Sequence, residues 1–98
     1  MIEFEYKGYN FKMNEWNLSD FSDETKGYVQ AETNLGWVDI IEYHSFEDNS
    51  TLTLLDENNY TERYYEDDNF YFDEEHVTSF ISGNEYSVME LIKEEQAV

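Results

Sequence analysis

The segment IEFEYKGYNFKM, residues 2–13, alternates apolar and polar side chains on either side of the dipeptide Lys7-Gly8. Alternation with a period of two is typical of a β-strand with one buried face, and glycine supplies the positive φ that a two-residue hairpin loop requires. We therefore expect a β-hairpin with Lys7 and Gly8 as its loop, its register stabilised by aromatic cross-strand pairs. The expected pairs on the apolar face are Tyr6 with Tyr9, Phe4 with Phe11 and Ile2 with Met13.

Beyond the hairpin, short runs rich in β-branched and aromatic residues, separated by turn residues, predict further strands. Asn34 and Gly36 suit a hairpin loop between two of them. The run Tyr60–Glu66 alternates without an apolar face, which is typical of an edge strand or of a strand with both faces partly exposed to solvent. The expected strands are Gly27–Thr33, Trp37–His44, Thr51–Leu55, Tyr60–Glu66 and His76–Ile81, with turns at 46–50 and 56–59.

Two segments have weaker patterns. Residues 14–26 are polar with isolated apolar side chains, and they predict an irregular helical turn followed by a loop. The last stretch, Tyr86–Val98, has apolar residues at helical spacing, and Ser87 with Glu90 matches a capping box. A strand that pairs back through the turn Gly83-Asn84 is the alternative for this stretch. Between the two, we expect a short C-terminal helix.

These elements predict a mainly β, α+β fold: a twisted antiparallel sheet of five to seven strands with an N-terminal hairpin and at most one or two short helices. A chain of 98 residues has room for one modest core, so residues 1–98 are expected to form a single acidic domain. The residues expected to lie mostly in that core are Ile2, Phe4, Phe11, Trp37, Ile40, Leu52, Leu54, Phe70, Phe72, Val77, Phe80 and Ile81.

The composition is strongly acidic, with 24 Asp and Glu against 5 Lys and Arg and a formal net charge of −19. Self-repulsion on this scale lowers folding stability, so we expect the charge to serve a function. It would bind a basic protein partner or a cation, or suit a high-salt environment. Direct binding to nucleic acid or to an anionic membrane is disfavoured. The absence of cysteine excludes disulfides and thiolate metal sites. No basic leader and no apolar run of about 20 residues is present, so a cytoplasmic protein is expected.

The charge is concentrated with aromatic rings in DENNYTERYYEDDNFYFDEE, residues 56–75, where nine acids and six aromatics accompany the single base Arg63. Disordered acidic tails are poor in aromatic residues, so this composition indicates a folded, negatively charged surface. We predict that this surface binds a basic partner. The residues predicted to contact it are Glu62, Glu66, Asp67, Asp68, Asp73, Glu74 and Glu75, followed by Asp56, Glu57, Tyr64, Tyr65 and Tyr71.

Motifs for metal binding and catalysis are missing from the sequence. An EF-hand loop beginning at Asp67 would need glycine at its sixth position and glutamate at its twelfth, where the chain has Phe72 and Thr78. His44 and His76 are isolated from each other and from any cysteine. No nucleophile elbow or glycine-rich phosphate loop is present. We therefore expect no catalytic residue, no metal site and no cofactor.

In size, charge, lack of cysteine and its mixture of acids and aromatics, the chain resembles the small acidic inhibitors that phages and mobile elements direct against host defence. These include anti-CRISPR proteins and antirestriction DNA mimics. The resemblance implies a non-catalytic inhibitor, acting in the cytoplasm of a bacterial host as a monomer or homodimer. Its partner would be a basic nucleic-acid-binding protein, either a nuclease or a Cas effector whose DNA-binding cleft it blocks. Charge reversal of Asp67, Asp68, Glu74 and Glu75 together is then expected to abolish binding.

Two other hypotheses share these electrostatics. An immunity protein or antitoxin for a basic bacterial toxin would also use complementary charge, but with a compact aromatic or apolar anchor at the centre of its interface. A DNA mimic would instead spread acids over a long strip. The third hypothesis is a solvated acidic domain from a salt-adapted organism, with no partner for the charge.

Overall fold

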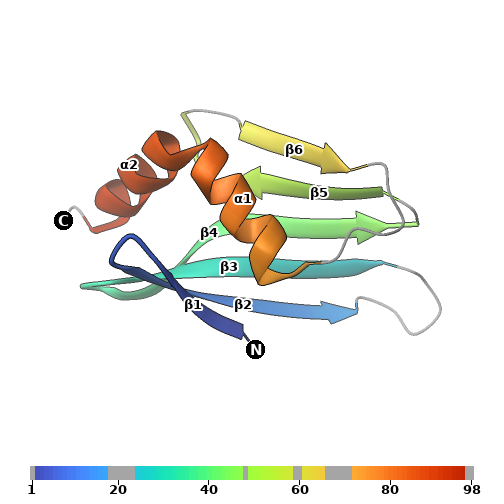
Figure 1. Ribbon diagram of the computed structural model, residues 1–98, viewed down its shortest axis with the longest axis horizontal. Coiled ribbons are helices and arrows are strands. Elements are labelled where there is room, and N and C mark those ends of the chain that lie inside the picture. The colour runs from blue at the N-terminus through green and yellow to red at the C-terminus, as the bar shows by residue number, and fades with distance from the viewer. Residues whose placement is uncertain (1, 18–23, 48, 59–60, 66–71, 97–98) are drawn as a thin grey trace.

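Six strands form one antiparallel sheet in strict chain order, with two helices following the last strand, in a computed structural model that describes residues 2–17, 24–47, 49–58, 61–65 and 72–96 (Figure 1). This confirms the predicted mainly β, α+β class, with its N-terminal hairpin and two short helices. The strands are β1 (Ile2–Tyr6), β2 (Tyr9–Asn17), β3 (Thr25–Thr33), β4 (Gly36–Phe46), β5 (Asn49–Leu54) and β6 (Thr61–Tyr65), and the helices are α1 (Glu74–Gly83) and α2 (Glu85–Gln96).

The β1–β2 hairpin has the predicted loop and register. Lys7 and Gly8 adopt φ values of 46° and 86°, the left-handed pair that a tight two-residue hairpin loop requires. Phe4 and Phe11 face each other with ring centroids 5.3 Å apart, and Phe11 is completely buried. Ile2, in contrast, is 43 % exposed, so its predicted place in the core is wrong.

Strands β2 and β3, on either side of the next connection, are longer than the sequence pattern indicates. β2 continues to Asn17 and β3 begins at Thr25, so residues 14–17 and 25–26 of the irregular turn and loop expected at 14–26 are strand. Residues 18–23 of that segment lie outside the described residues. The turn expected at 46–50 is also shorter, because β4 reaches Phe46 and β5 begins at Asn49. Cross-strand hydrogen bonding overrides the weak local preferences of these polar residues. The edge strand expected near Tyr60–Glu66 is confirmed as β6.

A β-bulge in β4 brings two isoleucines to the core. The register shifts between Val29 and Gln30, whose partners are Ile41 and Asp39, so Ile40 is the extra residue. Ile40 and Ile41 are both completely buried, although they are adjacent in the strand. The main-chain carbonyl of Ile40 accepts a hydrogen bond of 2.8 Å from the Leu55 amide just beyond β5.

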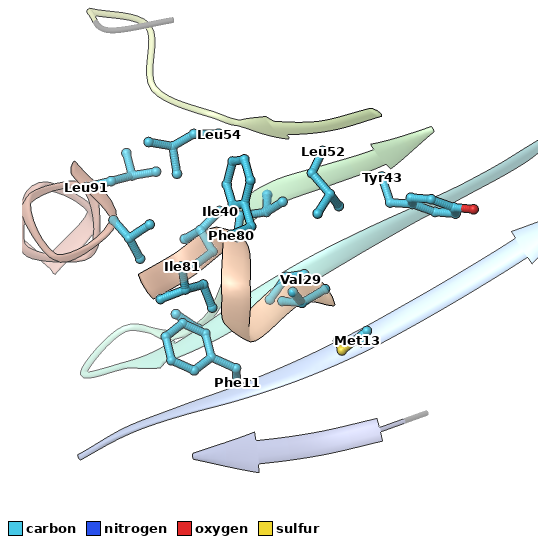
Figure 2. Close-up of a cluster of buried hydrophobic side chains, with 14 of the residues drawn as sticks. Phe11, Met13, Val29, Ile40, Tyr43, Leu52, Leu54, Phe80, Ile81 and Leu91 are labelled. Carbon is cyan, nitrogen blue, oxygen red and sulfur yellow. The ribbon is translucent and has the colours of Figure 1, made fainter. Parts of the chain in front are cut away.

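Residues 76–81 are helical, and the strand predicted there is wrong. They belong to α1, which buries Val77, Phe80 and Ile81 against the sheet, a spacing of three and four residues that fits one helix face (Figure 2). Asp73 is the N-cap residue, and its side chain accepts a hydrogen bond of 2.8 Å from the His76 amide. The cap and the apolar face together determine the helix.

The predicted C-terminal helix is confirmed as α2, which buries Val88, Leu91 and Ile92 with the same spacing as α1. It begins at Glu85, so Ser87 and Glu90 lie inside the helix and do not form the expected capping box. Glu85 accepts hydrogen bonds from Tyr6 (2.9 Å) and Lys7 (2.9 Å), which joins the hairpin loop to the start of α2. Hydrogen bonding by Lys7, and then by Tyr6, lowers the pKa of Glu85.

Both helices cover the same face of the sheet, and Figure 1 shows α1 lying across the strands. The opposite face, which we call the open face, is covered by no helix among the described parts of the chain. The molecule is elongated, with extents of 42 × 23 × 22 Å. Neither described helix is long and apolar enough to cross a membrane. Of the expected core residues, Trp37 and Phe72 are only partly buried, and Phe70 lies outside the described residues.

Candidate functional site

The open face of the sheet carries a spread of carboxylates. Because side chains alternate along each strand, the residues between the core positions point to this face. Strands β1, β3, β4 and β6 each place at least one acid there, about 6.7 Å apart when two acids alternate on one strand. All but Glu42 are well exposed. The acids on the open face are Glu3, Glu5, Glu32, Asp39, Glu42 and Glu62.

The lysines on this face are occupied by partners within the chain. Lys26 forms an ion pair with Glu42 (3.2 Å), and hydrogen bonding to Tyr28 and to Glu42 raises the pKa of Lys26. The ammonium group of Lys12 lies 4.4 Å from the centre of the Trp37 ring, a cation–π contact. These contacts hold the positive charges against the sheet, so the exposed carboxylates dominate the outward charge.

The first turn of α1 is a second acidic region. Glu74 and Glu75 are exposed there, whereas Asp73 accepts hydrogen bonds from the His76 amide (2.8 Å) and the His76 ring Nδ1 (2.7 Å). Burial acts to raise the pKa of Asp73, but hydrogen bonds from the His76 main chain and ring outweigh it, and the pKa is lowered. Of the three predicted contact acids in this region, Asp73 therefore has a structural role as a helix cap.

Strand β6 and the turn before it hold the other described candidates. Glu62 and Tyr64 are exposed on the open face, and the Tyr64 hydroxyl donates a hydrogen bond of 2.7 Å to Asn49. Glu57 is exposed in the turn, while Asp56 accepts a hydrogen bond of 3.0 Å from the Asn58 amide and so stabilises that turn.

The described candidates fall in two regions rather than one. Glu62 and Tyr64 lie on the edge strand β6, whereas α1 begins beside Ile2 of β1, the edge strand on the other side of the sheet. Five strand spacings, about 24 Å, separate these two edges. Glu66, Asp67, Asp68 and Tyr71 lie outside the described residues, as does the side chain of Tyr65.

A shallow polar hollow of about 270 Å³ lies on the open face, lined in part by His44, Glu24 and Thr51. His44 Nε2 lies 2.8 Å from the Glu24 carboxylate, within hydrogen-bonding distance. The hydroxyl of Thr51 lies 3.5 Å from the main-chain oxygen of His44. Within the part of the chain that the structure describes, no three His, Asp or Glu side chains are arranged to hold a metal ion.

Sequence reasoning missed four acids of the open face, on strands β1, β3 and β4. Glu3 and Glu5 look like ordinary solvated residues in the sequence, as do Glu32 and Asp39. For Glu3, Glu5 and Glu32 the available signal was the strand alternation itself, which points them away from the core residues of their own strands. Asp39 reaches the open face only because of the bulge at Ile40.

Comparison of the chain with protein-family models, with curated proteins and with solved structures finds no match.

Proposed function

We propose that this protein is a non-catalytic inhibitor that imitates the charge of duplex DNA and blocks the DNA-binding cleft of a host-defence nuclease. A Cas effector is the first candidate, which makes the protein an anti-CRISPR. The partner is a basic nucleic-acid-binding protein, and binding is stoichiometric.

The match between the charge and the length of the molecule carries this proposal. The chain is 42 Å long and carries 24 acids and a net charge of −19. Duplex DNA carries one charge for about every 1.7 Å of its axis, so 42 Å of duplex carries about 25 charges. A groove lined with Lys and Arg would therefore meet a comparable number of anionic groups over the same distance.

The internal pairing of the bases supports the same proposal. Lys7, Lys26 and Lys93 each form an ion pair with a carboxylate of the chain, at 2.9, 3.2 and 3.4 Å. They offer a basic groove little repulsion. Acids on four strands and in the first turn of α1 then keep the electrostatic potential negative on both sides of the sheet, as the phosphates do around a duplex.

One observation favours the immunity protein as a second candidate. Phe46 and Tyr64 are 47 % and 55 % exposed. Asn49 is the cross-strand partner of Phe46 and accepts a hydrogen bond from the Tyr64 hydroxyl. Exposed aromatic residues of this kind are typical anchors at the centre of a protein interface. Binding to a toxin with a pocket for these two side chains would not depend on the DNA-like charge.

The test is affinity capture from a bacterial lysate with the immobilised protein, followed by elution with duplex DNA or with a salt gradient. We expect to capture a nucleic-acid enzyme that both treatments release. DNA would compete for its basic residues, and salt would weaken the contacts of those residues with the carboxylates. Capture of a protein that DNA does not displace would favour the immunity protein. Recovery of no specific protein would contradict both candidates.

Two charge-matched variants locate the contact. Glu74→Gln with Glu75→Gln and Glu94→Gln with Glu95→Gln each remove two exposed carboxylates from one helix, so the net charge is equal. We expect the first variant to weaken binding to the captured enzyme by about tenfold, equivalent to about 1.4 kcal/mol, and the second to change it little. Equal weakening by both variants would show that only total charge matters and would contradict a site at the start of α1.

A further inference from the structure

Strand β1 is an edge strand whose outer hydrogen-bonding groups can be assigned from the hairpin register. Tyr6 and Tyr9 close the two-residue loop, so they exchange main-chain hydrogen bonds, and the ladder then alternates along the strand. Glu3 and Glu5 fall at the non-hydrogen-bonded positions, and their N–H and C=O groups point away from β2. No described strand pairs with that side of β1.

An open hollow of about 650 Å³ lies beside this edge, on the helix side of the sheet. It is lined by Ile2 of β1 and by the N-terminal part of α1, including Glu74, Glu75 and Thr78. Ile2 faces the same side of β1 as the buried Phe4 but remains 43 % exposed, because no described side chain covers it fully. An apolar side chain from an added strand would cover Ile2 there.

The charges around β1 determine which strand fits. Glu3 and Glu5 alternate on the open face, about 6.7 Å apart, and Glu74 and Glu75 border the hollow on the other face. A second copy of β1 would place Glu against Glu, which opposes self-pairing.

We propose that β1 binds an extended segment of a basic partner protein by strand addition, a segment in which Lys or Arg alternates with apolar residues. The main chain of the segment pairs with Glu3 and Glu5, and its basic side chains contact their carboxylates on the open face. Its apolar side chains lie against Ile2 in the hollow. This binding mode goes beyond the proposed function, because it requires a basic extended segment and does not require the partner to bind DNA.

The probe is a seven-residue synthetic peptide in which lysine and valine alternate, with both ends blocked. We expect saturable binding to the full-length protein at 0.15 M salt. A peptide with the same four lysines and three valines in two blocks has the same charge and composition but lacks the alternation. It is expected to bind at least about tenfold more weakly. Equal affinity for both peptides would indicate general charge attraction and would overturn the proposal.

Two substitutions at one position separate main-chain pairing from charge. Glu3→Gln removes only the carboxylate and is expected to weaken peptide binding by about twofold to fivefold, the scale of an exposed ion pair. Glu3→Pro also removes the outward N–H, which edge strands tolerate, and is expected to weaken binding by at least about tenfold. Equal affinities for the two variants would overturn the main-chain pairing.

Measurements on the unchanged protein complete the test, so the result does not depend on the folding of the proline variant. In amide NMR spectra, the signals of Glu3 and Glu5 should shift and gain protection from hydrogen exchange when the alternating peptide is added. Changes that bypass β1 would overturn the proposal. For the protein alone, sedimentation measures whether a dimer forms, and hydrogen exchange measures whether the Glu3 and Glu5 amides are protected. A dimer in which these amides are protected would mean that a second copy occupies this edge, and would overturn the proposal.

Discussion

Gly27 in β3 lies at a position where two neighbouring groups leave no room for a side chain. A Cβ atom there would lie 2.6 Å from the main-chain oxygen of Asn14 and 2.8 Å from Cε1 of Phe72. Phe72 in turn stacks on Tyr43, the cross-strand partner of Gly27, with ring centroids 4.4 Å apart and an interplanar angle of 3°. The glycine lets the segment entering α1 lie directly on the sheet.

We therefore expect Gly27→Ala to destabilise the protein by about 1–3 kcal/mol, the usual cost of forcing atoms into a packed site. Gly83→Ala is the control, because a Cβ atom at Gly83 meets nothing within 4 Å and alanine favours a helix. Thermal or urea unfolding of both variants measures the difference. An unchanged or increased stability of Gly27→Ala would contradict the close approach of Phe72.

At the scale of elements, α1 depends on its N-cap. Asp73 accepts a hydrogen bond from the His76 amide in the first turn and places a negative charge at the positive end of the helix dipole. Its lowered pKa means that the folded state favours the ionised carboxylate. The stabilisation is therefore present above the pKa of the unfolded carboxyl group, and it is lost as the pH falls through the lower pKa of the folded state.

Asp73→Ala is expected to lower the free energy of unfolding at pH 7 by about 1 kcal/mol, which corresponds to about 4–8 °C in Tm. Asp73→Asn retains an oxygen acceptor and should lose less. The gap between the wild type and Asp73→Ala should narrow below about pH 4, where the carboxyl group of the unfolded chain becomes protonated. A gap that stays constant between pH 7 and pH 3 would contradict a role for the ionised carboxylate.

For the whole molecule, the net charge of −19 acts across a particle only 42 Å long. At 0.01 M salt the Debye length is about 30 Å, so carboxylates on different elements repel one another, whereas at 0.1 M it falls to about 10 Å. We expect Tm to rise when sodium chloride increases from 0.01 to 0.5 M. A constant or falling Tm would mean that the internal ion pairs of the lysines outweigh the repulsion.

Local patterns were sufficient for much of the fold. The β1–β2 hairpin was predictable to the residue because its loop, its alternation and its aromatic pairs all lie within residues 2–13. The helix α1 was missed because Val77, Thr78 and Ile81 have high strand propensity, and the same apolar residues can be assigned to a strand or a helix over so short a run. The signal that favoured a helix was Asp73 followed by Glu74 and Glu75.

For the candidate site, the sequence alone determined the sign and amount of the charge, since composition does not depend on folding. Only the tertiary structure decided what each acid does. It makes Asp73 a helix cap, exposes Glu74 and Glu75, and places Glu3 and Glu5 along an open sheet edge beside the exposed Ile2. The physical reason is that solvent exposure and strand pairing depend on contacts between distant segments, such as α1 with β1, and local sequence does not encode such contacts.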